Sequence, residues 1–99
     1  MALARRIPRL SASLKRGLLK LGVAPRSARF RAVFATVATL ANAEVLPAAM
    51  DAETVFPPGR AYVRRVSGQN LWVLFRFDAT HVDVLAVRDA PPVPFEEHE

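Results

Sequence analysis

Arginine and aromatic residues alternate in the C-terminal half of the chain, and they are the side chains best suited to chemistry. Arg64 shares a strand face with Tyr62, and Trp72 shares one with Arg76, because alternate residues of a strand point to the same side. An aromatic ring can stack on a nucleobase while a neighbouring guanidinium holds a phosphate. The residues that we expect to contact a nucleic acid or another target in this way are Arg60, Tyr62, Arg64 and Trp72.

Clustered arginines can also stabilise the charge that develops on a phosphate when RNA is cleaved without a metal. The candidate catalytic residues are Arg65, Arg76 and Arg88. Such cleavage needs a base that activates the 2′-hydroxyl, and His81 and Asp83 are the sheet-associated candidates. The alternatives are a solvated strand face, on which arginine stems cover the core, and a turn histidine beside a solvated acid.

The composition excludes several other chemistries. The chain of 99 residues has no cysteine, which excludes a cysteine nucleophile, a disulfide scaffold and the common zinc knuckles. The second of the two histidines, His98, lies in the terminal sequence EEHE, and we expect no metal site and no cofactor. The four glycines are scattered, so the sequence contains no glycine-rich phosphate loop.

Positive charge is concentrated toward the N-terminus. The first 43 residues carry nine lysines and arginines and no acid, whereas the remaining residues carry five arginines and nine acids. An unbroken block of like charge predicts a negative partner, which is a nucleic acid, an anionic surface or an acidic protein segment. On the first expected helix, Lys15, Arg16 and Lys20 lie off the apolar stripe, so we expect them to contact this partner.

Apolar spacing and capping residues divide the chain into elements. Leu14, Leu18 and Leu21 form one helical stripe that follows Ser11, and Gly22 is suited to end that helix. Later in the chain the apolar period changes to two, which predicts β-strands. The expected elements are a basic arm or short edge strand at 1–10, helices at 11–22 and 27–42, a loop at 43–59, and strands at 61–66, 71–77 and 82–87.

These elements predict an α+β fold in which an N-terminal helical hairpin packs on a small antiparallel β-sheet. We expect one domain at 1–88, with a β-meander at 61–88, followed by a proline-rich acidic tail at 89–99. No apolar run approaches the length of about 18 residues that a membrane span needs, and the absence of cysteine fits a cytoplasmic protein. The expected core consists of Leu14, Leu18, Leu21, Phe30, Val33, Phe34, Val37, Val73, Phe75, Phe77, Val84 and Ala86.

Five segments of the chain carry a likeness to a known family. They are Ser11-Ala12 at a helix start, Lys20-Leu21-Gly22 at its end, and the strands at 59–66 (GRAYVRRV), 71–77 (LWVLFRF) and 82–87 (VDVLAV). In this order they resemble the RelE/ParE superfamily, the toxins of bacterial toxin–antitoxin pairs. The likeness covers nearly the whole chain as far as Arg88.

The resemblance implies a toxin that contacts RNA on the ribosome, or gyrase in the ParE branch, and that an antitoxin protein neutralises through an acidic segment. Arg65 matches a basic residue of the RNA-cleaving members, whereas Trp72 stands where they carry an arginine on the central strand. Residues 88–94 (RDAPPVP) replace their basic run after the last strand. Three activities remain open: a metal-independent mRNA endonuclease, a gyrase-targeting toxin, and a catalytically inactive binding module of the same fold.

Overall fold

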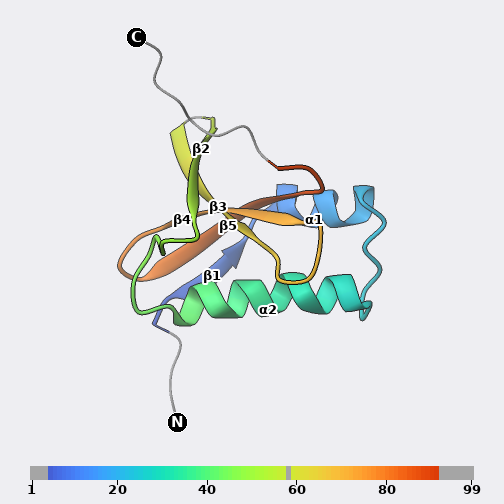
Figure 1. Cartoon of the computed structure of the whole chain (residues 1–99), viewed down its shortest axis with the longest axis horizontal. Helices are drawn as coiled ribbons and strands as arrows, with labels where there is room; N and C mark the ends of the chain where they lie inside the picture. Colours follow the sequence, from blue (N-terminus) through green and yellow to red (C-terminus); the bar gives the residue numbers. More distant parts are fainter. Residues whose placement is uncertain (1–4, 58, 92–99) are drawn as a thin grey trace.

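The computed structural model describes residues 5–57 and 59–91 and shows an α+β fold with two helices on one face of a five-stranded sheet (Figure 1). The strand order is β1-β5-β4-β3-β2, in which β1 runs parallel to β5 and the other neighbouring strands are antiparallel. No helix in the described part of the chain is long and apolar enough to cross a membrane. In chain order the elements are β1 (Ile7–Leu10), α1 (Ala12–Lys20), α2 (Ala28–Asn42), β2 (Ala52–Phe56), β3 (Gly59–Arg65), β4 (Trp72–Phe77) and β5 (His81–Arg88).

Both expected helices are present, and both begin after the expected capping serines. The Ser11 hydroxyl accepts a hydrogen bond from the Leu14 N–H at 3.0 Å, and the Ser27 hydroxyl accepts one from the Phe30 N–H at 3.1 Å. Gly22 follows α1 with a φ of +68°, in the left-handed region that glycine adopts at helix ends. Each helix packs on the sheet, since α1 contacts β5 and α2 contacts both β1 and β5.

The three expected strands are present and pair antiparallel, but the expected sheet is wrong in its extent, because it has two further edge strands and one of them is parallel to its neighbour. β1 pairs with β5 in parallel, from Ile7 opposite His81 to Leu10 opposite Val84. The N-terminal segment is therefore an edge strand rather than a free arm, and the helices follow it instead of standing first in the chain. At the other edge, β2 lies within the segment that was expected to be a loop.

The two errors at the sheet edges have different physical causes. Pro47 and Pro57 dominate the local signal around β2, but they flank the strand and do not interrupt its pairing with β3. The partner of Ile7 is His81, 74 positions further along the chain, so no local pattern reveals the direction of β1.

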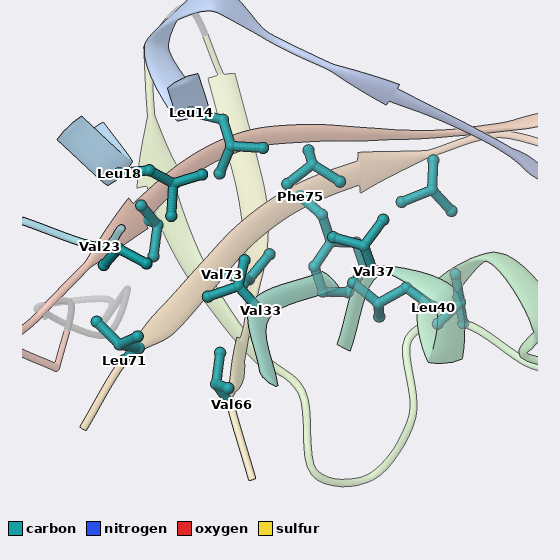
Figure 2. Packing of buried hydrophobic residues seen from close by; sticks show 14 residues of the cluster. Leu14, Leu18, Val23, Val33, Val37, Leu40, Val66, Leu71, Val73 and Phe75 are labelled. Atoms are coloured by element: carbon teal, nitrogen blue, oxygen red, sulfur yellow. The ribbon is translucent and has the colours of Figure 1, made fainter. Parts of the chain in front are cut away.

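Helices and sheet meet in an apolar core around Phe75, which is fully buried (Figure 2). Leu21, Phe30, Phe34 and Phe77 pack at the margin of this core and are partly buried. The buried residues of the core are Leu14, Leu18, Val23, Val33, Val37, Leu40, Leu46, Val66, Leu71, Val73, Phe75, Val82, Val84 and Val87.

One residue of the expected core, Ala86, lies on the opposite face of the sheet. The pairing of β4 with β5 shifts between Leu74, which faces Ala86, and Phe75, which faces Val84. This β-bulge adds one residue to β5, so Ala86 no longer shares a face with Val84. Val87 joins the helix side in its place, and Ala86 forms a smaller cluster with Val63 and Leu74.

A buried ion pair joins the segment before β2 to β3. The Arg64 guanidinium donates from Nε to Asp51 Oδ1 at 2.6 Å and from Nη2 to Asp51 Oδ2 at 2.7 Å. The two side chains are 8% and 0% exposed, and Asp51 Oδ2 also accepts a hydrogen bond from the Ala48 N–H. Arg64, which we expected on a binding surface, is therefore buried and holds the α2–β2 connection against the sheet.

This pair should contribute strongly to stability. In Asp51→Asn the Arg64 guanidinium loses its counter-charge, and a buried charge left without its partner costs about 3–5 kcal/mol. The matched control is Glu53→Gln, which removes an exposed ion pair of 3.2 Å with Arg60 and should cost less than about 1 kcal/mol. Urea unfolding followed by circular dichroism measures the free energy of unfolding of both variants. An equal loss in Asp51→Asn and Glu53→Gln would contradict the role assigned to Asp51.

Candidate nucleic-acid interface

The helices cover one face of the sheet, and the other face, here called the open face, carries a row of Arg65, Trp72 and Arg88. Arg65 of β3 pairs with Trp72 of β4, which in turn pairs with Arg88 of β5. The Arg65 guanidinium lies 5.9 Å from the centre of the Trp72 ring. It also donates to the Gln69 carbonyl and to Asn70 Oδ1, both at 3.2 Å. The indole therefore lies between two arginines, one of which is held in place.

The expected binding residues separate onto the two faces because side chains alternate along a strand. Tyr62 is on the helix side, where its ring packs 5.9 Å from Phe75 and 5.6 Å from Phe77. Arg60 follows the same alternation and pairs with Glu53 at 3.2 Å. Arg60, Tyr62 and the buried Arg64 thus do not join Trp72 in one site.

Arg76 lies on the open face but is used to hold the β2–β3 hairpin. Its Nε donates to the Arg60 carbonyl at 2.8 Å, and its Nη2 donates to the Phe56 carbonyl. The guanidinium also lies 5.7 Å from the centre of the Phe56 ring. Along β4, Arg76 is four residues from Trp72, which corresponds to roughly 13 Å at the usual rise of a strand. The structure therefore brings together Arg65 and Arg88 of the candidate catalytic set and places Arg76 elsewhere.

The two candidate bases lie far from the Trp72 row. Asp83 is bound by Arg9 in two hydrogen bonds of 2.5 and 3.0 Å, and His81 Nδ1 lies 2.7 Å from the Thr80 hydroxyl. Along β5, Asp83 is five residues before Arg88, a separation of roughly 16 Å. A phosphate held at the row would therefore lie beyond hydrogen-bonding reach of either base.

Arginines near the start of the chain are paired at the same end of the molecule as His81. Arg6 donates to the Asp78 carbonyl at 2.8 Å and to the Ala43 carbonyl at 3.1 Å, and Arg5 lies 3.7 Å from Glu44. Asp78 orders the adjoining turn, and hydrogen bonds from the backbone N–H groups of Thr80 and His81 lower its pKa. Positive charge at this end is largely satisfied by neighbouring acids and carbonyls.

The opposite end of the molecule collects cations that have no such partners. It is formed by α1, the start of α2 and the C-terminal end of β5, which lie together at the right of Figure 1. Among described residues, no hydrogen bond or ion pair is made by the side chains of Lys15, Lys20, Arg26, Arg29 or Arg31, and the Arg88 side chain makes only a 3.4 Å bond to the Val87 carbonyl. We call the surface of these six residues the basic end. Arg16 beside them donates to the Ser13 hydroxyl at 3.2 Å.

At the start of α2 the placement of these cations is unfavourable for the isolated protein, whereas Lys20, in the last turn of α1, is placed favourably in the helix dipole. Neither helix has an acid in its first turn, and Arg29 lies near the N-terminus of α2, where the helix dipole is positive. Their mutual repulsion adds to this effect. An anionic partner at the basic end would reduce both the unfavourable interaction with the helix dipole and the repulsion among the cations.

A pocket of about 370 Å³ opens between α1 and the end of β5. Gly17 allows this close approach, since a Cβ at that position would lie 3.2 Å from Val87 Cγ1. The pocket contains Arg88, so it adjoins the Trp72 row. Its lining residues are Gly17, Lys20, Leu21, Val87, Arg88 and Asp89.

The described residues contain no group of three or more histidines, cysteines or acids that could hold a metal ion. No protein-family model matches the chain, and no match was found among curated proteins or solved structures. The RelE/ParE resemblance therefore stays a prediction from the sequence.

Sequence reasoning missed the pocket and the pairing of the cations. A glycine in the middle of a helix that is otherwise well formed was the one available signal, because glycine there is unfavourable unless another segment comes close. Which arginines are neutralised depends on contacts between distant segments, such as Arg9 with Asp83, and these have no local signature.

The arginines of the open face should differ in their effect on stability. Arg76→Met removes two charged hydrogen bonds to backbone carbonyls and should lower the free energy of unfolding by about 1–2 kcal/mol. Arg88→Met removes an exposed side chain whose one described contact is the 3.4 Å bond to the Val87 carbonyl, and it should change the free energy of unfolding by less than about 0.5 kcal/mol. Urea unfolding compares the two variants; a larger loss in Arg88→Met would contradict this division of roles.

Proposed function

We propose that the chain is a RelE/ParE-like toxin that binds single-stranded RNA through Trp72 and the basic end and does not cleave it. The observation that carries the proposal is the row of Arg65, Trp72 and Arg88, in which Arg88 also belongs to the basic end and lines a pocket together with Lys20. The order of a strand, two helices and a set of antiparallel strands supports the family part of the proposal.

Single strands fit this arrangement better than duplexes. The indole can stack only on a base that is free of its own pair, and the Arg65 guanidinium over the ring can extend the same stack. Neighbouring strands lie about 4.8 Å apart, so the backbones of β3 and β5 place Arg65 and Arg88 roughly 10 Å apart on either side of Trp72. Phosphates before and after a stacked base would meet these two guanidinium groups.

The absence of cleavage follows from the position of the candidate bases. Cleavage at a phosphate held by Arg65 and Arg88 also requires a base nearby that takes the proton of the attacking 2′-hydroxyl. His81 and Asp83 lie toward the other end of β5, and Asp83 is bound by Arg9. Binding and catalysis are thus separated along the same strand.

The basic end also suits an acidic segment of an antitoxin protein, as the RelE/ParE resemblance implies. The specific observation in favour is that Lys15, Lys20, Arg29 and Arg31 lie on exposed helix positions with no acid in the first turn of either helix. In this arrangement the antitoxin and the RNA compete for one surface, and neutralisation requires no separate site.

RNA binding should depend on salt and on individual residues of the row. For a single-stranded RNA, each phosphate contact contributes about −0.7 to the slope of log affinity against log salt, so Arg88→Gln should make the slope shallower by about that amount. Trp72→Leu should weaken binding about tenfold with little change in slope, because it removes a stack. Fluorescence anisotropy with a labelled oligonucleotide at several salt concentrations measures both effects.

The matched control for charge is Arg5→Gln, which removes one positive charge at the opposite end, beside Glu44. It should leave the affinity and the slope close to those of the unchanged protein. Equal weakening by Arg5→Gln and Arg88→Gln would mean that binding follows net charge alone, and it would contradict the assigned surface.

Expression in a bacterial host tests the toxin and cleavage parts of the proposal. We expect growth arrest with intact mRNA, and we expect the double variant Arg65→Gln/Arg88→Gln to restore growth because it removes the target-binding row. Growth curves and total RNA on gels give the two readouts. Fragmented mRNA that becomes intact in the double variant would overturn the non-catalytic assignment, and normal growth would overturn the toxin assignment.

A further inference from the structure

We infer that the pocket between α1 and β5 is a subsite for one guanine nucleotide of the bound RNA strand. The inference rests on the proposed function, because it assigns base selection to a cavity beside the RNA-binding row. Its volume of about 370 Å³ lies within the range of about 300–1,000 Å³ that is usual for small-molecule sites.

The pocket exists because β1 is shorter than β5. β1 pairs with β5 only from His81 to Val84, and beyond Val84 the helix α1 runs along that edge of the strand. The contact of Gly17 with Val87 brings the two elements together at the floor of the pocket. The last residue of α1, Lys20, and the last residue of β5, Arg88, then form part of its wall.

The lining combines three kinds of surface. Leu21 provides partly exposed apolar surface, against which a flat base can lie, while Val87 is 2% exposed and belongs to the core beneath the pocket. Lys20 and Arg88 provide two cations, which can hold the phosphate of the same nucleotide. Asp89 is the one acid of the lining, and its carboxylate makes no ion pair or hydrogen bond with any described residue, not even with the two cations beside it.

A carboxylate without a described partner, in the same lining as two cations, suits a ligand that carries hydrogen-bond donors as well as negative charge. A carboxylate only accepts hydrogen bonds, and its two oxygens match two adjacent N–H donors. Guanine presents such a pair on its Watson–Crick edge, at N1 and at the exocyclic N2, and bases of single-stranded RNA are read on this edge. Adenine and cytosine present an amino group beside an acceptor, and uracil presents one N–H between two carbonyls, so each would meet Asp89 with an opposed lone pair.

Labelled pentanucleotides that differ at one position test the inference: UUGUU, UUAUU, UUCUU and UUUUU, with affinities measured by fluorescence anisotropy. The unchanged protein should bind UUGUU about tenfold more tightly than the other three, as expected for one bidentate contact to a base. Asp89→Asn should reduce this preference to less than about twofold while UUUUU binds as tightly or more tightly, because the pocket loses a negative charge. Asp89 is exposed, so the variant should fold.

The matched control is Glu44→Gln, which changes the net charge equally at the other end of the molecule and should keep the preference for UUGUU. Equal affinity of the unchanged protein for all four RNAs, or an unaltered preference in Asp89→Asn, would overturn the guanine subsite and leave RNA binding by the Trp72 row intact. Failure to bind any of the four RNAs would overturn the proposed function together with the subsite.

Discussion

Ser11 makes the connection on which the arrangement of the site depends. Its N–H donates to the Val84 carbonyl at 3.1 Å and its hydroxyl donates to the Leu85 carbonyl at 2.7 Å, which continues the attachment to β5 where β1 ends. The same hydroxyl accepts from the Leu14 N–H and thereby caps α1. At Ser11 the chain therefore stops pairing with β5 and begins α1, and the helix continues along the edge of β5 that β1 leaves uncovered. This path of α1 produces the pocket and brings Lys20 into the same lining as Arg88.

The distribution of arginines shows how the fold uses a basic sequence. Arg64 and Arg76 bind a carboxylate and backbone carbonyls and hold the β2–β3 region, while Arg9 is neutralised by Asp83. These contacts hold the three guanidinium groups in place, and the carboxylates of Asp51 and Asp83 balance the charge of Arg64 and Arg9. What remains is at the other end, where Arg29 lies unfavourably at a helix N-terminus. Because such charges oppose stability, a binding role explains them better than a structural one.

Local signals were sufficient for the helices and for three strands, and contacts between distant segments explain where prediction failed. Capping serines, the alternation of β4 and the glycine after α1 are all readable within a few residues. The parallel pairing of β1, the bulge that turns Ala86 away, and the Arg64–Asp51 pair depend on partners outside such a window. For the same reason the sequence indicated that Trp72 belongs with arginines, but it could not indicate that Arg65 and Arg88 are those arginines.

The open face itself limits where a ligand can bind. Its centre is occupied by Val63, Leu74 and Ala86, which are buried beneath neighbouring side chains, and apolar surface of this kind offers no hydrogen bond to a phosphate. At one end of β5, Asp83 satisfies Arg9 and leaves little net charge. At the other end, β5 finishes with Arg88, which pairs with Trp72 and shares a pocket lining with Lys20. Charged side chains, an aromatic ring and a cavity therefore lie close together there. The proposed RNA recognition would therefore be concentrated at the C-terminal end of β5, away from the candidate bases His81 and Asp83 near the start of the strand.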